Sequence, residues 1–216
     1  MQHLIVATRN AHKTREIQRI LGADFAVSDL SAYPETPETV ESGKTFEENA
    51  VLKATAAARQ LPGLVVADDS GLEVDALGGA PGIYSARYAG QNATDRQNID
   101  KLLAELMRVE RAKRSARFRC VIALARKGKL LGTFEGVVEG VVVEPPRGRS
   151  GFGYDPVFMP RGFGKTFGQL SPIEKDRVSH RAHALEKLLV RLSVLSKARE
   201  SRAKKVSVVR SRACES

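Results

Sequence analysis

Hydrophobic and polar positions along this chain form two patterns, short apolar runs and longer segments with an apolar stripe. An apolar run of about four to eight residues is typical of a buried strand, whereas apolar positions recurring every three or four residues are typical of a helix. We therefore expect strands at residues 4–8, 64–67 and 117–125, with further strands through Val143. The first helix is expected to end before Gly22, because glycine favours that terminal position.

Capping residues indicate where the other helices begin. Thr45 with Glu48 forms a capping-box pattern, and the alanine-rich segment that follows runs to about Gln60, before Pro62-Gly63 ends it. Two further starts have the same pattern, Thr94 with Gln97 and Ser171 with Glu174. The residues expected on the apolar helix faces are Ile17, Ile20 and Leu21; Ile99, Leu103 and Leu106; and Val178, Ala182, Leu185, Leu189 and Leu192.

The order of these elements indicates one α/β unit with a mixed β-sheet. Helices separate the early strands, whereas Lys127-Gly128-Lys129 is a plausible hairpin turn between later ones. The sequence has no internal repeat and no linker before its end. We therefore divide it into one domain, residues 1–196, and a tail, residues 197–216.

The basic charge of the chain is concentrated in that tail. The formal net charge is +10, and the tail holds seven basic residues against two acidic ones, a net +5. Its few scattered valines and alanines offer too little apolar surface to offset the entropy of ordering, so we expect it to be disordered. A nucleic-acid-binding module is the alternative interpretation of this charge.

Two features favour a cytoplasmic protein. No apolar stretch approaches the roughly 18 residues of a membrane span, and the N-terminal run is too short for a signal peptide. Cys120 lies in an apolar run and Cys214 in the polar tail, which suggests one buried and one exposed thiol rather than a disulfide.

The first candidate for chemistry is the turn after the first strand, where Lys13 stands at a helix start. Free backbone N–H groups, the positive end of the helix dipole and an ammonium would together attract phosphate. The turn lacks the glycines and spacing of a Walker loop. An ordinary strand-to-helix turn with a solvated lysine is the alternative.

The second candidate is Asp68-Asp69-Ser70, placed by the pattern just after the strand at 64–67. Open α/β sheets commonly bind ligands at this position. Two carboxylates side by side repel each other unless a cation such as Mg²⁺ intervenes, and Mg²⁺ would also hold substrate phosphates. The alternative is one capping and one solvated aspartate.

The third and fourth candidates lie in the C-terminal half. Glycines flank Phe152 in the segment 150–156, which could expose its ring to a planar ligand, or the ring could instead enter the core. Lys175 extends the apolar stripe of the last helix backward from Val178, so it should point inward. His180 and Arg181 follow within two turns, with solvated surface positions as the alternative for both.

Taken together, these segments resemble the inosine and xanthosine triphosphate pyrophosphatases, from Met1 to Leu195. Six segments in the same order support the resemblance: 7–16 (ATRNAHKTRE), 45–50 (TFEENA), 67–74 (ADDSGLEV), 80–90 (APGIYSARYAG), 151–156 (GFGYDP) and 179–182 (SHRA). Arg9 and His12 stand where the family often has glycine, and Asp176 stands where asparagine is common.

The resemblance implies a two-lobed α/β fold around a long mixed sheet, a homodimer, and an active site in the cleft between lobes. It makes Asp69 the proton acceptor, with Glu41 and Asp69 binding Mg²⁺. Thr8, Asn10, Lys13 and Lys53 would hold the triphosphate. The other residues expected to contact substrate are Arg9, Ala11, His12, Ser70, Phe152, Gly153, Tyr154, Asp155, Lys175, His180 and Arg181.

The implied reaction is hydrolysis of ITP, dITP, XTP or dXTP to the monophosphate and pyrophosphate. Water would attack the α-phosphorus, activated by Mg²⁺ or by Asp69. Lys175 and Arg181 would donate to O6 of the purine, which selects against ATP. We expect no membrane contact and no specific nucleic-acid binding. A pyrophosphatase for another modified nucleotide is the nearer alternative.

Overall fold

The computed structural model describes residues 2–195, so the predictions for the tail and for Cys214 lie outside the described residues. The strands are β1 Gln2–Val6, β2 Phe25–Asp29, β3 Leu64–Val74, β4 Ser115–Arg126, β5 Lys129–Val142 and β6 Phe158–Pro160. The α-helices are α1 Ala11–Leu21, α2 Phe46–Gln60, α3 Asp95–Glu105, α4 Pro172–Val178 and a helix over residues 180–195.

One six-stranded mixed sheet organises the molecule, in the order β2-β1-β3-β4-β5-β6. The pairs β1–β2 and β1–β3 are parallel, whereas β3–β4, β4–β5 and β5–β6 are antiparallel. Lys127 and Gly128 form the expected hairpin turn between β4 and β5, and both have positive φ, as tight hairpin turns require. The α/β class and the mixed sheet are confirmed, but the short strands β2 and β6 were not anticipated.

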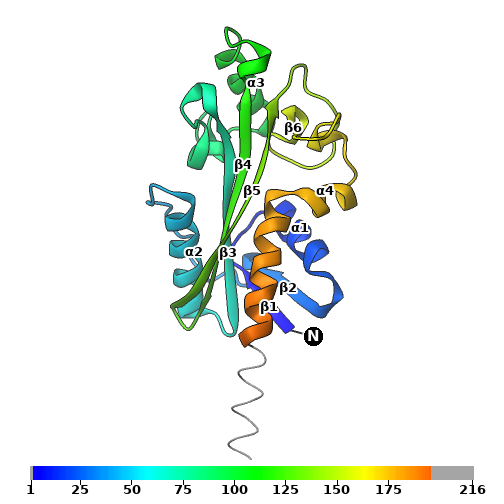
Figure 1. The fold of residues 1–216 in the computed structure, drawn as a ribbon. Coiled ribbons are helices and arrows are strands. Elements are labelled where there is room, and N and C mark those ends of the chain that lie inside the picture. Colours follow the sequence, from blue (N-terminus) through cyan, green and yellow to red (C-terminus); the bar gives the residue numbers. More distant parts are fainter. Residues whose placement is uncertain (1, 196–216) are drawn as a thin grey trace, which may run out of the picture.

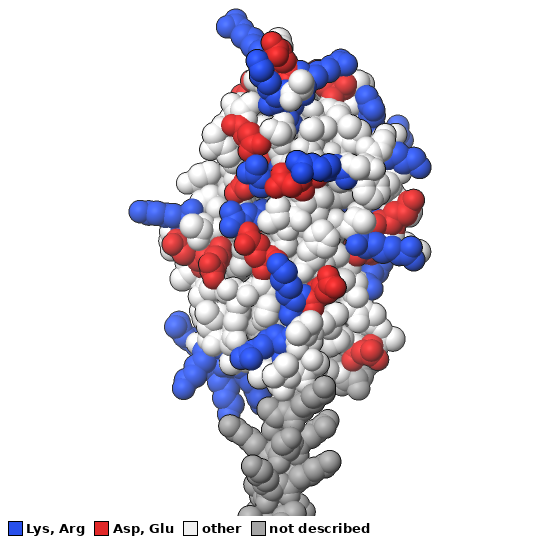
Figure 2. Space-filling model, viewed as in Figure 1, with Lys and Arg blue, Asp and Glu red and all other residues white. Residues whose placement is uncertain are grey.

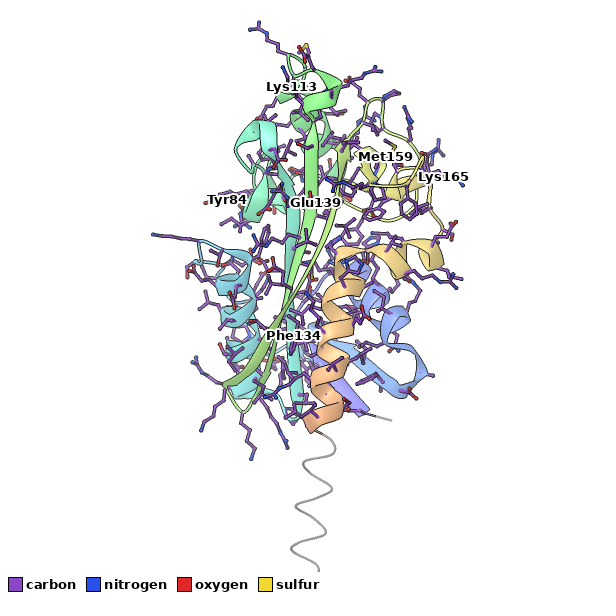
Figure 3. All side chains as sticks on the ribbon, viewed as in Figure 1. Tyr84, Lys113, Phe134, Glu139, Met159 and Lys165 are labelled. Atoms are coloured by element: carbon purple, nitrogen blue, oxygen red, sulfur yellow. The ribbon has the colours of Figure 1, made fainter. Side chains whose placement is uncertain are left out.

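The long strands β3, β4 and β5 run through the whole length of the molecule, with helices on both sides (Figure 1). Along one part of the sheet, α2 packs on one face, and α1 and the helix 180–195 pack on the other. Phe134 of β5 packs within this second core (Figure 3). A third core surrounds the far ends of the long strands and includes residues of α3 and β6.

The last helical segment is interrupted, which corrects the expectation of one continuous helix from Ser171. Ser179 has extended backbone angles, φ −76° and ψ 155°, between α4 and the helix 180–195. Its Oγ accepts a hydrogen bond from the N–H of Ala182 at 3.1 Å, so Ser179 caps the second helix. The break lies directly before His180 and Arg181 and sets the direction in which their side chains enter the interior.

The structure also describes the Cys120 thiol and the length and polarity of the helices. Cys120 is a buried free thiol, as its apolar surroundings in the sequence predicted. Between residues 2 and 195, no helix is long and apolar enough to cross a membrane.

Candidate active site

Asp68 and Asp69 lie within β3 rather than after it. The strand was expected to end at residue 67, but β3 continues to Val74. Within it, Asp68 pairs with Ile122 and Asp69 with Val121 of β4. Successive strand side chains point to opposite faces, so the two carboxylates diverge. The expectation that they lie side by side and share a cation is wrong. The alternative is also wrong, because both residues are buried.

Asp68 faces α1 and the helix 180–195. Its Oδ2 accepts from Arg181 Nε at 2.9 Å, and its Oδ1 forms an ion pair with Lys13. Ser70 Oγ also donates to Oδ1, at 3.0 Å. Burial raises the pKa of Asp68, but Arg181 and Lys13 outweigh it and hold that pKa well below its usual value. Asp68 is therefore a fully paired anion that organises one side of the site.

Asp69 faces α2 on the opposite side of the sheet. Lys53 Nζ lies 2.7 Å from Asp69 Oδ1 and 2.8 Å from Glu41 Oε1, so one ammonium holds both carboxylates. The other oxygen of Asp69, Oδ2, is enclosed and has no hydrogen-bond partner among residues 2–195. Burial raises the pKa of Asp69, and the nearby Lys53 and Lys13 only partly offset this. Asp69 is thus the more basic and less satisfied of the two aspartates.

The two sides of the sheet meet at an open edge of β3. Beyond Val66, no strand in the described part of the chain pairs with β3 on the side of β1. The carbonyl oxygen of Asp68 accepts there from Lys53 Nζ at 3.0 Å and from Lys13 Nζ at 3.4 Å. One lysine comes from α2 and the other from α1. Two ammonium groups therefore converge at the end of β1, where a polyphosphate could pass from one face to the other.

The backbone N–H groups of the turn before α1 were expected to be free to bind phosphate, but three of them are bonded within the turn. Asn10 Oδ1 accepts from the N–H groups of His12 and Lys13, at 2.9 and 3.3 Å, and Thr8 Oγ1 accepts from the N–H of Asn10. These donors already have partners. Arg9 donates to two backbone carbonyl oxygens, one of them that of Thr36 at 2.9 Å. Lys13 is not a solvated lysine, since its ammonium pairs with Asp68, so its charge is what this turn brings to the site.

Phe152 stands beside a small cavity rather than in the core. The cavity has a volume of about 120 Å³. The residues that line it are His12, Arg15, Glu16, Arg19, Ser150, Gly151, Phe152, Leu170, Pro172 and Lys175. Lys175 Nζ lies 5.0 Å from the centroid of the Phe152 ring, and the His12 ring lies 5.4 Å away. The Arg181 guanidinium lies 5.7 Å from the same centroid, and a half-buried ring with two cations beside it fits stacking on a planar, electron-rich ligand.

Asp155 fixes the loop that carries Phe152. Its Oδ2 accepts from the N–H of Phe152 at 2.9 Å and from Lys175 Nζ at 2.6 Å. Gly151 has φ +77°, and a Cβ there would overlap Asp155 Oδ2, so this turn requires glycine. Lys175 is buried, as its place on the helical stripe predicted.

Glu16 is a site residue to which the sequence reasoning gave no role. It is buried, lies 2.6 Å from Lys175 Nζ, and forms a second ion pair with Arg181. Arg181 itself donates to Glu16, Asp68 and Ser70, so each of its three nitrogen atoms has a protein partner. Glu16 follows Lys13 by three residues and precedes Ile17, which places it on the inner side of α1 and could have identified it.

His180, Tyr154 and Gly153 were expected to contact the substrate, but they lie away from the small cavity. The His180 ring stacks on Phe118, with centroids 4.7 Å apart, and burial with the nearby Arg181 charge holds its pKa well below the usual value. Tyr154 is buried, and its hydroxyl donates to the carbonyl oxygen of Ser85 at 2.9 Å. The N–H of Gly153 donates to Asp95 at 2.6 Å. None of the three appears in the lining of the small cavity.

A divalent cation would find only a sparse protein site here. No group of three or more His, Cys, Asp or Glu side chains that could hold a metal occurs in the described residues. Glu41 and Asp69 share Lys53, and Asp69 Oδ2 is free to accept a further partner. Mg²⁺ is typically bound by one or two carboxylates together with substrate phosphates, so this pair has the required chemistry.

Comparisons with known proteins agree with the resemblance seen in the sequence. The sequence model of the Ham1 family matches residues 4–191 of this chain. The dITP/XTP pyrophosphatases of Bacillus licheniformis and Geobacter sulfurreducens are 50% and 52% identical to this chain, over 87% and 86% of it and over 96% and 94% of their own lengths. The solved structure of the Staphylococcus aureus Ham1 protein is 41% identical, with a TM-score of 0.78 over 91% of this chain and 100% of that one. The chain therefore belongs to the Ham1 family.

Proposed function

We propose that this protein hydrolyses deaminated purine nucleoside triphosphates, ITP, dITP, XTP and dXTP, to the monophosphate and pyrophosphate. The names of its relatives as dITP/XTP pyrophosphatases support this activity. The observation that carries the proposal is the convergence of Lys13 and Lys53 on the open edge of β3, next to a buried aspartate with a free oxygen. That arrangement provides both charge for a triphosphate and a group that can activate water.

Glu41 and Asp69 are the residues that would hold Mg²⁺. The free Oδ2 of Asp69 supports this assignment, as does the single ammonium that now keeps the two carboxylates together. When bound, the cation would lower the pKa of a coordinated water and neutralise charge on the phosphates. Lys53 and Lys13, which both contact the Asp68 carbonyl oxygen, would neutralise phosphate charge from the two sides of the edge.

Asp69 is also the proposed proton acceptor. An ordinary aspartate is a weak base, but burial raises the pKa of Asp69 in the metal-free protein, so its carboxylate enters the reaction as a more basic group than an exposed one. Asp68 is unsuited to this role, because Arg181 and Lys13 hold its pKa well below the usual value. Ser70, on the same face of β3 as Asp68, would contact the substrate on that side.

The purine would stack on Phe152, with Lys175 close to its edge. Lys175 has three N–H donors, and Glu16 and Asp155 take two of them. The third could donate to O6 of a 6-oxopurine, whereas adenine presents a donor at that position. Buried donors left facing a donor can discriminate by roughly 10⁴-fold or more, so ATP should be a very poor substrate. We place this chemistry in a cytoplasmic homodimer, with the substrate cleft between two lobes.

A nucleic-acid-binding module explains less of the described molecule. Basic and acidic side chains are interleaved over most of the face shown in Figure 2. On the sheet, Arg117 pairs with Asp75 at 2.8 Å and with Glu139 at 3.2 Å, which reduces its use as a phosphate contact. Salt-dependent DNA binding without nucleotide hydrolysis would favour this alternative.

The direct test is release of pyrophosphate from a panel of nucleoside triphosphates, with and without Mg²⁺. We expect release from ITP, dITP, XTP and dXTP that depends on the metal, and very little from ATP. Equal rates on ATP, or hydrolysis to phosphate and the diphosphate, would contradict the proposal.

A further inference from the structure

Glu41 reaches the site on a loop, residues 33–45, that contains no helix or strand. A proposed metal ligand on such a loop must be held in place by side chains, because no backbone ladder does so. Lys53 of α2 contacts its carboxylate at 2.8 Å, and Arg87 of the short helix Gly82–Arg87 contacts the other oxygen at 3.1 Å. Tyr84 of that short helix lies at the surface beside this region (Figure 3). These contacts fix the carboxylate but not the backbone behind it.

Asn49 holds that backbone. Its Oδ1 accepts from the N–H of Gly43 at 2.8 Å, two residues after Glu41. Asn49 stands four residues before Lys53 in α2, so both side chains lie on one face of the helix. One face of α2 thus holds the loop at two points, its backbone through Asn49 and its carboxylate through Lys53.

The position of Asn49 is unfavourable for stability, which indicates a role. The residue is 0% exposed, and its Nδ2 has no hydrogen-bond partner in the described part of the chain. A buried donor without a partner is destabilising, and an apolar side chain of similar shape would remove that penalty. The acceptor on the same amide is the feature that an apolar residue could not supply.

Gly43 brings the loop into direct contact with α2. A Cβ at this position would lie 2.7 Å from Asn49 Oδ1 and 2.7 Å from Glu48 Cβ, which is closer than real Cβ atoms approach. The loop backbone therefore rests on the helix, and any side chain at residue 43 would lift it away.

We propose that Asn49 is a positioning residue for the cation site, acting through the Gly43 N–H to set the place of the Glu41 carboxylate. This inference rests on the role of Glu41 in the proposed function. It gives a role to the segment 45–50, which the sequence analysis singled out without assigning it to substrate or metal.

The test is Mn²⁺ binding to the whole chain, measured by electron paramagnetic resonance with α,β-imido-ITP, which is not cleaved. Asn49→Leu, which removes the acceptor, should weaken Mn²⁺ binding about tenfold, and Asn49→Asp, which keeps it, should stay within about threefold of the wild type. The KM for ITP at saturating metal should not change in either variant. If both variants weaken binding equally, the acceptor is not responsible and the inference fails.

Three further variants separate the possible outcomes. Glu41→Gln should weaken Mn²⁺ binding. Unchanged binding in this variant would overturn the assignment of Glu41 in the proposed function. Weaker binding in Glu41→Gln together with unchanged binding in Asn49→Leu would overturn only the inference about Asn49. Gly43→Ala lifts the loop without changing α2, so it should weaken binding even where Asn49→Leu fails to fold, and normal binding would overturn the inference. Gln18→Leu is the matched control, because Gln18 of α1 accepts from the N–H of Val27 at 3.0 Å on the other side of the sheet. An equal loss there would indicate general loosening and overturn the inference.

Discussion

Glu16→Gln tests the buried charge cluster that joins Asp68 of β3 to the residues beside the Phe152 cavity. The cluster contains three acidic and three basic side chains: Glu16, Asp68 and Asp155 with Lys13, Lys175 and Arg181. Glutamine keeps the shape of Glu16 and one acceptor oxygen but removes its charge. Lys175, Arg181 and Lys13 would then share two carboxylates instead of three, in a mostly buried region beside the small cavity.

The expected loss of stability is large for a single isosteric change. Removing one partner of a buried ion pair typically destabilises by about 3–5 kcal/mol, and because glutamine still accepts one hydrogen bond we expect about 3 kcal/mol. At about 2–4 °C per kcal/mol for a domain of this size, the melting temperature should fall by about 6–12 °C.

The effect should also depend on pH in a defined direction. Burial raises the pKa of Glu16, but Arg181 and Lys175 outweigh it, so its pKa in the folded protein is lowered from the usual value. A carboxyl group with a lowered folded-state pKa stabilises the protein above its unfolded-state pKa, and this stabilisation is lost as the pH falls through the folded-state pKa. The difference between wild type and Glu16→Gln should therefore be greatest near neutral pH and shrink in acid.

Calorimetric unfolding at neutral and acid pH measures both quantities. The matched control is Glu135→Gln, because Glu135 pairs with Arg119 at a site where both side chains are about two-fifths exposed. That change should cost less than about 1 kcal/mol. A melting temperature for Glu16→Gln as close to wild type as that of the control would refute the reasoning about the buried cluster.

Three other predictions follow from the site. Because burial raises the pKa of Asp69 in the metal-free protein, NMR titration of its carboxyl group without Mg²⁺ should give a pKa above that of an ordinary aspartate, and a pKa at or below the ordinary value would contradict the reasoning about its burial. Removing residues 197–216 should leave kcat/KM for ITP within about threefold, since every proposed site residue precedes them; a larger loss with the fold intact would give the tail a role. Lys175→Met should lower kcat/KM for ITP far more than for ATP, and equal losses would assign Lys175 to folding instead.

Local signals in the sequence predicted much of the secondary structure. The hydroxyl residues Thr45, Thr94 and Ser171 cap their helices as the pattern indicated, and Gly22 ends α1 with a positive φ of 69°. These features depend on neighbours within one turn of chain, so the sequence alone contains the necessary information. By contrast, all five residues of β2 are half-buried, and this short strand has no alternation that would identify it.

The central error concerned Asp68-Asp69-Ser70, and its cause lies far away in the chain. Three consecutive polar residues normally end a buried strand, but here Arg181, Lys13 and Lys53 neutralise the two aspartates from both faces of the sheet. Partners that distant in sequence cannot be read from a local pattern. The same limit explains why Asn49 gained a role only when its contact with Gly43 was known.

The break at Ser179 shows how a correct pattern can conceal a change of structure. The apolar stripe from Val178 to Leu192 continues with helical spacing on both sides of the break, so the sequence predicts one helix. The Ser179 hydroxyl caps a new helix instead, and nothing in the spacing distinguishes that cap from a helical serine.

The most direct test of the account compares Asp69→Asn with Asp68→Asn in the rate of pyrophosphate release from ITP at saturating Mg²⁺. Asp69→Asn keeps the shape of the site but removes the free basic oxygen and a proposed metal ligand, so kcat should fall by at least about 100-fold with little change in folding. Asp68→Asn removes a buried anion from Arg181 and Lys13, so it should act mainly by lowering the melting temperature. An Asp69→Asn protein that is folded and keeps most of its activity would contradict the central claim.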